Sequence, residues 1–381
     1  MKNKIHSISF ALVIALFFTF TSCQKAEITV QAQPSDTLQI TQMVFVADLH
    51  YGLTRAFRGN VVSASGVNEF MVSQINSLAT AVFPKDAGVN SEKTIGFIDY
   101  VAVGGDITNR QQSGVQSAAA SWSQFNSDYL NGITLKNKTN QPAQFLLTCG
   151  NHDVSNAIGY YKSLDPLTDN TTMVNIYNLM LKPAIPKTTQ NYSYKTDKPN
   201  FSKNISGAHL MFVTMWPDSV SRIWMENDLA KVGTSTPVII FTHDPAASEP
   251  AHFTNPLPGH KMTTDYENVI DQLFNGTLSC QREFAAFLKL HKNIKAYFHG
   301  HTNYNEFYTF VGPDGDLNLK VFRVDSPMKG NVSSTDETKL SFQVISLDGK
   351  NQTLTVRECL WNTSGASSKI NLGIRSTVSL K

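Results

Sequence analysis

Residues 43–50 read MVFVADLH, a short apolar run that ends in two potential metal ligands, Asp48 and His50. Four further apolar runs also end directly in polar motifs. These motifs are Gly104-Gly105-Asp106, Gly150-Asn151-His152-Asp153, Thr242-His243-Asp244 and His299-Gly300-His301. Short apolar runs rich in β-branched residues are typical of buried strands. We therefore predict that each motif lies at the carboxyl end of a buried strand.

The predicted strands alternate with stretches that have helical spacing. The strands span residues 43–47, 100–103, 144–149, 209–215, 237–243 and 294–299, and the helical stretches span 68–82, 118–130 and 282–290. Such alternation is typical of a layered α/β domain. After residue 305, turn signals such as GPDGD (312–316) and LDGK (347–350) separate closely spaced strands, which we interpret as a second sheet on the same core. The sequence thus predicts one α/β (α+β) domain over residues 43–375.

The five motifs are expected to converge, because ligand sites in layered α/β folds collect beyond the carboxyl ends of the strands. Residues two apart in an extended segment point to the same side, which would pair Asp48 with His50 and His299 with His301. Gly300 between the latter two leaves the opposite side free of bulk. Tight turns from strand to loop need residues that tolerate positive φ, and the glycines in such places are Gly104, Gly105 and Gly150.

The candidate ligands offer nitrogen and oxygen atoms and no thiolate. They are Asp48, His50, Asp106, Asn151, His243, His299 and His301. This donor set suits divalent or trivalent Mn, Fe, Zn or Co, and it disfavours a Cys-rich structural zinc site. Seven ligands exceed one tetrahedral ion but fit two ions that share a bridging carboxylate. Two ions roughly 3.5–4 Å apart can bind a phosphoryl oxygen, generate a bridging hydroxide nucleophile and stabilise the leaving oxygen.

The ordered motifs D-x-H, GGD, GNHD, H and H-x-H, from Asp48 to His301, resemble the calcineurin-like metallophosphoesterase superfamily. The resemblance implies a four-layer αββα sandwich of two mixed β-sheets flanked by helices. It implies that Asp48, His50 and His301 hold the first ion, that Asn151, His243 and His299 hold the second, and that Asp106 bridges them. It also implies that His152 protonates the leaving oxygen or stabilises the phosphoryl charge, with Asp153 as its orienting partner.

Several functions remain open within this interpretation. We favour a phosphodiesterase acting on a small-molecule or lipid phosphate ester, with a phosphomonoesterase or nucleotidase as the alternative. A catalytically silent binding lipoprotein is a second alternative. The presence of all seven candidate metal-ligating residues argues against it, because a protein that only binds its partner needs none of them. Specificity is expected in the loops 51–66, 154–200 and 244–276. For Arg55 and Arg110, which follow the first two motifs, a solvated surface position is favoured over phosphate binding.

The N-terminal residues have the features of an export signal. Lys2 and Lys4 precede an apolar run from Phe10 to Phe20 that is too short to span a bilayer, so residues 1–22 are predicted to be a signal peptide. The segment ending at Cys23 resembles the lipobox of bacterial lipoproteins, which implies a lipid anchor on Cys23; an ordinary secreted protein is the alternative. Residues 23–42 are polar and are expected to form a tether. We expect an exported monomer, anchored to a bacterial membrane on the periplasmic or cell-surface side.

Charge and cysteine content narrow the choice of partners. Without residues 1–22, thirty basic and thirty acidic residues remain. Proteins that bind nucleic acid normally carry a clustered positive excess, so nucleic acid is not an expected partner and a nuclease is disfavoured. Cys149 lies in an apolar run and is expected to be a buried thiol. A disulfide between Cys280 and Cys359 is left open by the sequence.

Overall fold

The computed structural model describes residues 39–109, 116–154, 169–194, 196–247, 276–363 and 370–381. The predicted signal peptide, Cys23 and the tether up to residue 38 lie outside these ranges. The first described strand begins at Ile40 and the last ends at Ser379, so strand structure extends slightly beyond residues 43–375 at both ends. Among the described residues, no helix combines the length and apolar character needed to cross a membrane.

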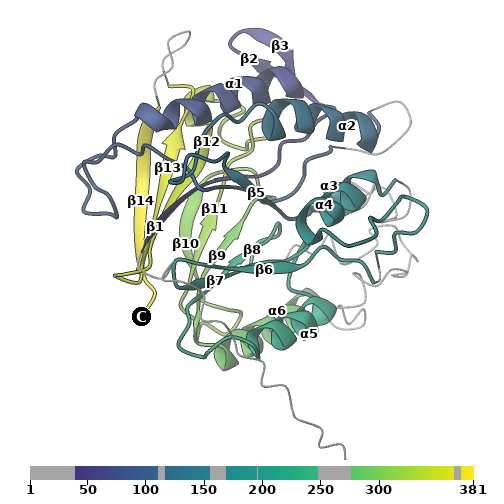
Figure 1. Cartoon of the computed structure of the whole chain (residues 1–381), viewed down its shortest axis with the longest axis vertical. Helices are drawn as coiled ribbons and strands as arrows, with labels where there is room; N and C mark the ends of the chain where they lie inside the picture. Colours follow the sequence, from purple (N-terminus) through teal and green to yellow (C-terminus); the bar gives the residue numbers. More distant parts are fainter. Residues whose placement is uncertain (1–38, 110–115, 155–168, 195, 248–275, 364–369) are drawn as a thin grey trace, which may run out of the picture. The chain divides into compact units, whose positions relative to one another are not determined.

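The first of two six-stranded sheets has the order β14-β13-β12-β1-β4-β5 (Figure 1). β1 pairs in parallel with β4 and antiparallel with β12, so the sheet is mixed. Its strands are β1 (Ile40–Val46), β4 (Tyr100–Val103), β5 (Gln144–Leu147), β12 (Ser341–Asp348), β13 (Thr353–Leu360) and β14 (Asn371–Ser379).

The second sheet has the order β10-β11-β9-β8-β7-β6. Its four central strands run parallel, and both edge strands pair antiparallel with their neighbours. Its strands are β6 (Phe201–Ile205), β7 (Ala208–Phe212), β8 (Val238–Phe241), β9 (Ile294–His299), β10 (Glu306–Phe310) and β11 (Leu319–Arg323). A separate hairpin consists of β2 (Thr54–Phe57) and β3 (Asn60–Ser63).

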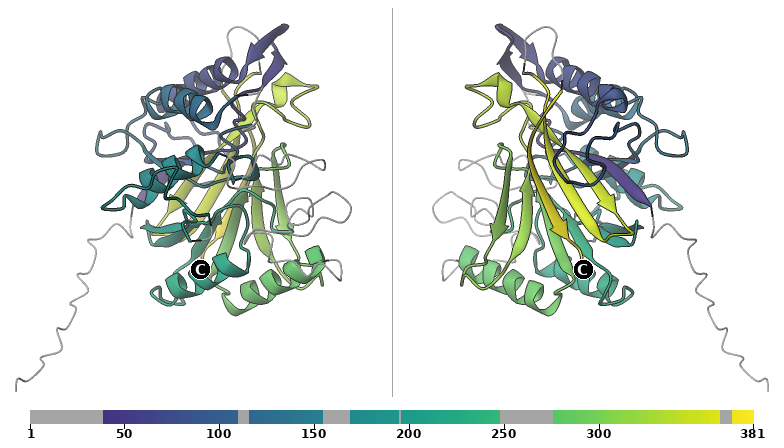
Figure 2. Two further views of the ribbon diagram at one scale, coloured as in Figure 1. Left: turned by 90° about the vertical axis from the view of Figure 1, so that its right-hand side faces the viewer. Right: turned by 90° about the vertical axis from the view of Figure 1, so that its left-hand side faces the viewer.

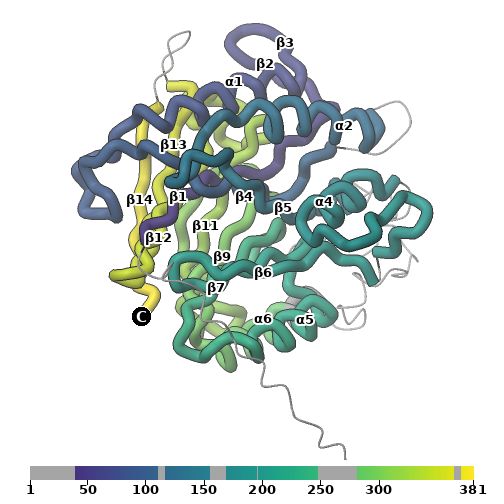
Figure 3. The backbone as a smooth tube through the Cα atoms, viewed as in Figure 1, coloured from purple at the N-terminus to yellow at the C-terminus, as the bar shows by residue number. Residues whose placement is uncertain are grey.

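The strands after residue 305 are divided between the two sheets, so the prediction that they form a sheet of their own is wrong. β10 and β11 extend the sheet that contains β9, whereas β12, β13 and β14 extend the sheet that contains β1. Figure 3 shows β12, β13 and β14, from the yellow end of the colour scale, on the same side of the molecule as β1, from the purple end. The reason is that β1 is buried and needs a backbone partner at each edge. β4 pairs with one edge and β12 with the other.

Helices cover the outer face of each sheet (Figures 1 and 2). Those on the first sheet are α1 (Ala64–Asn76), α2 (Ala118–Phe125), α3 (Asn151–Val154) and α4 (Thr171–Leu181), and those on the second are α5 (Ser219–Leu229) and α6 (Gly276–Leu290). Val44 and Val46 of β1 pack toward the first helical layer, whereas Met43 and Phe45 pack against the second sheet. A third apolar cluster joins the second sheet to α5 and α6. The four-layer αββα sandwich of two mixed β-sheets is therefore confirmed.

Phenylalanines from neighbouring strands stack where the two sheets meet. The rings of Phe201, Phe212, Phe241, Phe298 and Phe322 follow one another across β6, β7, β8, β9 and β11. Successive ring centroids are 4.6, 4.9, 4.6 and 4.8 Å apart. Aromatic pairs across strands stabilise a sheet and help to fix its register. This stack therefore helps to align the strand ends that carry the candidate ligands.

The three helices predicted from spacing are confirmed with altered ends. α1 begins earlier than predicted because Ser63 caps it by accepting the N–H of Gly66 at 3.3 Å. It ends at Asn76 and is followed by a 3₁₀ turn (Ser77–Thr80). α2 continues as a π-helical turn (Asn126–Leu130), which matches the predicted end. α6 begins six residues before the predicted 282–290 segment and ends with it.

The cysteines add no described disulfide. Cys149 is a buried free thiol, as predicted. Cys359 is also buried and free, and the side chain of Cys280 lies outside the described part of the chain.

Candidate metal centre

The motif-bearing loops meet beyond the carboxyl ends of their strands. The N–H of Asp48 donates to the carbonyl of Gly105 at 3.0 Å, which joins the loops after β1 and β4. The N–H of Gly300 donates to the carbonyl of His243 at 3.0 Å, which joins the loops after β8 and β9. The N–H of His301 donates to Asp48 Oδ2 at 2.8 Å and links the two sheets. The predicted convergence of the motifs is confirmed.

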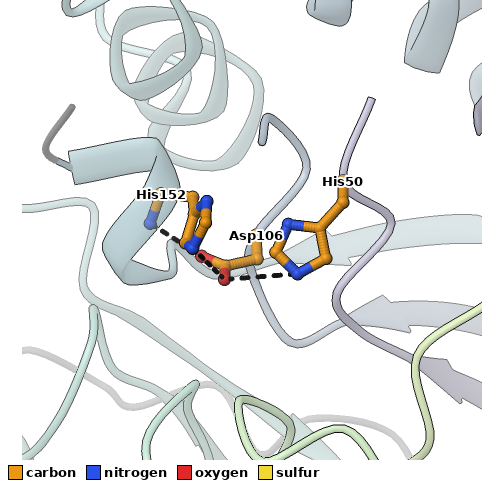
Figure 4. A group of neighbouring side chains, drawn as sticks. All are labelled: His50, Asp106 and His152. Atoms are coloured by element: carbon orange, nitrogen blue, oxygen red, sulfur yellow. Dashed lines mark hydrogen bonds and ion pairs between the residues drawn. The ribbon is translucent and has the colours of Figure 1, made fainter. Parts of the chain in front are cut away.

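The carboxylate of Asp106 lies at the centre of this region, between the rings of His50 and His152 (Figure 4). Its Oδ2 atom is 3.3 Å from His243 Nε2 and 3.8 Å from both His50 Nε2 and His152 Nε2. Its Oδ1 atom accepts the backbone N–H of His152 at 2.8 Å. His50 Nε2 is also 3.6 Å from Asp48 Oδ1. One buried carboxylate is thus surrounded by three imidazoles.

Most of these separations exceed hydrogen-bond length and match the spacing of ligand atoms around an ion. Two ligand atoms about 2.1 Å from a tetrahedral ion lie about 3.4 Å apart. Asp48 Oδ1 and both ring nitrogens of His50 are buried without a hydrogen-bond partner among the described residues, although buried polar atoms are normally paired. The potential ligand atoms form three groups, and within each group the atoms lie within 4.8 Å of one another. The groups are His50, Asp106 and His152; Asp48, Asp106 and His243; and His243, Asp244 and His301. The residues therefore fit a metal centre.

Several candidate ligands hold a strained backbone. Left-handed φ values occur at Asp48 (59°), His50 (46°), Asp106 (54°) and His301 (67°). This conformation costs about 1–2 kcal/mol for a residue with a Cβ atom, and such strain clusters at functional sites. Among the glycines expected to supply positive φ, Gly105 does so at 91°, whereas the expectation is wrong for Gly104 and Gly150. The strain thus falls on the ligands themselves.

Two glycines are required for space. A Cβ atom at Gly150 would clash with Asp106 Oδ1 and lie 2.6 Å from the Asp106 backbone nitrogen. A Cβ atom at Gly300 would clash with Asp48 Oδ2 and lie 2.6 Å from the Cβ atom of Ala47. Each glycine therefore lets a neighbouring strand end bring its carboxylate close to the backbone.

Both ring nitrogens of His299 contact groups outside the set of candidate ligands, and the imidazole lies near enough to His243 to interact with it electrostatically. His299 Nδ1 lies 2.9 Å from the carbonyl of Gly300, and its Nε2 lies 2.9 Å from the hydroxyl of Tyr308. The ring of His301 lies beside that of His243, with centroids 5.2 Å apart. The expected pairing assumed an extended chain, but β9 ends at His299 and His301 adopts a left-handed φ. Same-side alternation holds only within the strand.

Asn151 and His243 are adjacent. His243 Nε2 lies 3.1 Å from Asn151 Oδ1, and His243 Nδ1 lies 2.8 Å from the carbonyl of Gly104. A backbone carbonyl that accepts one ring N–H fixes the tautomer and the orientation of a ligand imidazole. The loop after β4 therefore directs His243 Nε2 toward Asp106.

The ring of His152 is fixed from one side. Its Nδ1 contacts the carbonyl of Asn109, and its Nε2 faces Asp106 and lies 3.3 Å from Lys329 Nζ. Burial lowers the pKa of His152 to about 3, with Asp106 acting in the opposite direction. Near neutral pH the imidazole is therefore neutral, donating through Nδ1 and accepting through Nε2.

Asp153 contacts the backbone of the loops that carry Asp106 and His152. Its carboxylate accepts the backbone N–H groups of Gly150 and Thr108, each at 3.0 Å. The Thr108 hydroxyl in turn donates to the carbonyl of His152 at 2.9 Å. Asp153 thus ties the loop after β4 to the loop after β5, and it orients His152 through the backbone.

The buried acids raise the proton affinity of His243. Burial lowers the pKa of this imidazole, but Asp106, Asp48 and Asp244 outweigh the effect and raise it to about 10. Burial raises the pKa of Asp48 to about 7. Burial also raises the pKa of Asp106, but His243 and the other imidazoles outweigh this and leave it well below its usual value. A proton on His243 therefore supplies positive charge that a metal cation would replace.

Metal binding should therefore release about one proton from His243 near neutral pH, since a ligand imidazole must be neutral. Because the pKa of His243 is about 10, protons compete with the metal below that pH, and affinity should rise with pH. Calorimetric titration with Zn²⁺ in buffers of different ionisation enthalpy measures the protons released. His243→Gln should lower the count by about one. Equal counts in the two proteins would contradict the assignment.

Three residues have positions that the sequence did not predict. Asp244 groups with His243 and His301, but a single acid after a histidine carries no spacing signal. Lys329 reaches His152 from a loop without a motif. Arg55, expected at the surface, is buried and donates to the carbonyls of Pro327 and Ser333. Arg110 lies outside the described residues.

Comparison with known proteins places the chain in a family. A family model described as calcineurin-like phosphoesterase matches residues 42–304. No curated protein matches the chain. Similar solved structures include purple acid phosphatase PPD1 from yellow lupin (Lupinus luteus), with a TM-score of 0.46 and 11% identity over 90% of this chain and 54% of that chain. This chain thus covers about half the length of the lupin enzyme.

Two further similar structures come from other organisms. A putative 5'-nucleotidase from Staphylococcus aureus has a TM-score of 0.38 and 10% identity over 90% of this chain and 54% of that chain. GAP50 of Plasmodium has a TM-score of 0.38 and 12% identity over 88% of this chain and 90% of that chain. The family model spans more than half of the chain and includes every motif from Asp48 to His301. The chain therefore belongs to the calcineurin-like phosphoesterase family.

Proposed function

We propose that this phosphoesterase works through two metal ions and prefers a phosphodiester substrate. The observation that carries the two-ion proposal is the position of Asp106, whose Oδ2 atom faces three imidazole nitrogens at 3.3–3.8 Å. Two ions in such a site supply positive charge to the phosphoryl oxygens and activate the attacking water. Asp106 belongs to two of the three groups of ligand atoms, as a bridging carboxylate should.

The remaining candidate ligands lie around Asp106. Asp48 and His50 come from the loop after β1, and we propose that they hold one ion together with His301, whose backbone N–H donates to Asp48 Oδ2. Asn151 and His243, which are 3.1 Å apart, are proposed for the second ion. His299 remains the third ligand proposed for that ion, as the family resemblance implies.

His152 is the proposed contact to the phosphoryl or leaving oxygen, a role in which Nε2 must carry a proton; the negative charge of a bound phosphate would favour that protonation. Its Nε2 atom points toward Asp106, and the carbonyl of Asn109 holds the opposite ring nitrogen. Asp153 supports this arrangement through the backbone of Thr108 and Gly150. A fixed ring reduces the reorganisation needed during the reaction.

A phosphomonoester is the second candidate substrate, and one observation favours it. Lys329 places an ammonium group 3.3 Å from His152 Nε2. An additional cation favours the doubly charged phosphate of a monoester over the singly charged phosphate of a diester. A comparison of kcat/KM for a monoester and a diester therefore tests the proposed diester preference.

Turnover of two chromogenic substrates by the purified full chain in detergent solution tests the proposed function. After treatment with chelator and addition of Mn²⁺ or Zn²⁺, we expect hydrolysis of bis-p-nitrophenyl phosphate, with a lower kcat/KM for p-nitrophenyl phosphate. Absence of turnover with either metal would support a silent binding protein and overturn the proposal. A higher kcat/KM for the monoester would overturn only the diester preference.

We also propose that the protein is an exported monomer with a lipid anchor at Cys23, on the periplasmic or cell-surface side of a bacterial membrane. The proposal rests on the signal-like residues 1–22 and on the cysteine that follows them. Mass spectrometry of the mature N-terminus tests it: a diacylglyceryl group on Cys23 is expected, and an unmodified N-terminus would refute it.

A further inference from the structure

Lys329 lies next to the candidate catalytic histidine without belonging to any of the five motifs. Its Nζ atom is 3.3 Å from His152 Nε2, although the two residues are 177 positions apart in the chain. Lys329 is partly buried in the turn formed by residues 327–329, between β11 and β12. Its charge also acts on Asp48 and His50, so the ammonium belongs to the electrostatic environment of the whole centre.

A hydroxyl group ties the backbone of Lys329 to a candidate metal ligand. Ser326 Oγ donates to the carbonyl of Asp48 at 2.8 Å. The same oxygen accepts the backbone N–H groups of Met328 at 3.1 Å and Lys329 at 2.9 Å. The position of the lysine is therefore linked to the loop that carries Asp48 and His50.

A buried arginine also holds this loop. The guanidinium of Arg55 donates to the carbonyl of Pro327 at 2.6 Å and to the carbonyl of Ser333 at 2.7 Å. These contacts fix the chain before and after Lys329. Buried hydrogen bonds from a charged donor are among the stronger ones in proteins. The hydrogen bonds from Arg55 therefore help to fix the position of the backbone that carries Lys329.

The contact with His152 leaves the charge of the ammonium group intact. An imidazole carries no negative charge in either of its protonation states, so this contact does not neutralise the ammonium group. Lysine is a common phosphate-binding residue, acting as a point charge. The same position would place it beside a phosphate group that contacts His152.

We propose that Lys329 is a substrate-binding residue whose ammonium group contacts a non-bridging oxygen of the phosphate and sets the balance between monoesters and diesters. This inference rests on the proposed function, since it requires a phosphate ester in the centre. A monoester carries a charge of about −1.5 to −2 at neutral pH and a diester carries one negative charge, so the lysine contributes more to the monoester.

Kinetics and phosphate binding of the metal-loaded full chain test this role in Lys329→Gln and Lys329→Arg. Lys329→Gln should lower kcat/KM for p-nitrophenyl phosphate by about thirtyfold and for bis-p-nitrophenyl phosphate by less than about fivefold. Affinity for inorganic phosphate, measured by calorimetry, should fall by about tenfold. Lys329→Arg should restore most of both losses. Lys339→Gln, on the same segment and exposed, is the matched control and should change neither quantity.

The readouts separate the possible failures. An equal loss for both esters with unchanged phosphate affinity would assign Lys329 a structural role and overturn the inference. Unchanged values in Lys329→Gln would also overturn it. If the unmodified chain hydrolyses neither ester, the proposed function fails, and the calorimetric comparison still decides whether Lys329 binds phosphate. A wild-type chain without measurable phosphate affinity would refute the inference as well.

Discussion

Asp106→Asn is expected to lower metal-dependent turnover by at least about a thousandfold, because it removes the charge shared by both proposed ions. The backbone N–H of His152 donates to Asp106 Oδ1 at 2.8 Å, so the amide oxygen of the variant should keep that position. The amide nitrogen would then replace Oδ2, which faces His243, His50 and His152. An amide nitrogen carries protons and cannot serve as a metal ligand there.

Asp228→Asn is the matched control for this substitution. Asp228 Oδ2 lies 2.9 Å from His209 Nε2, which reproduces a carboxylate–imidazole contact at the amino end of β7. The control should keep wild-type metal content and wild-type kcat/KM. Metal content measured by mass spectrometry and turnover of bis-p-nitrophenyl phosphate decide the comparison. Turnover retained in Asp106→Asn would show that Asp106 does not bridge two ions.

Gly150→Ala is expected to damage both the fold and the metal centre. The added methyl group would clash with Asp106 Oδ1 and lie 2.6 Å from the Asp106 backbone nitrogen. The chain has little freedom to move away, because the N–H of Gly150 donates to the buried carboxylate of Asp153 at 3.0 Å. We expect a loss of about 2–4 kcal/mol in the free energy of unfolding. Affinity for Zn²⁺ should fall by about a hundredfold as the loop after β5 moves.

Gly233→Ala provides the control for the added methyl group. Its nearest neighbours would be the Oγ1 atom of Thr236 at 3.8 Å and the Oγ atom of Ser235 at 3.9 Å, which is ordinary contact. Its unfolding free energy should stay within about 0.5 kcal/mol of the wild type. Denaturant unfolding in the presence of chelator gives the stability, and calorimetry gives the Zn²⁺ affinity. Wild-type values for Gly150→Ala in both measurements would contradict the close packing of the strand ends.

The strands and the position of the site were predictable because their signals are local. Runs such as 43–47 and 237–243 are apolar from end to end, and each stops at a polar motif. Burial on both faces of a sheet produces such continuous runs. The convergence of the motifs then followed from the general behaviour of α/β sheets.

The features that were not predictable depend on contacts between distant parts of the chain. The assignment of β12 to the sheet of β1 is decided by antiparallel pairing across some three hundred residues, from Ile40–Asp348 to Phe45–Gln343. His299 was expected to share a side with His301, but the rule behind that expectation fails where β9 ends. Lys329 has no motif around it, and only the folded chain brings it to His152.

The number of ions bound per chain tests the central claim most directly. Native mass spectrometry of the full chain in detergent solution, after loading with Mn²⁺ or Zn²⁺, counts them without any assumption about the substrate. Asp106, surrounded by three imidazoles, predicts two ions in the wild type and a loss of metal in Asp106→Asn. A wild-type chain that binds no ion, or only one, would contradict the two-metal centre.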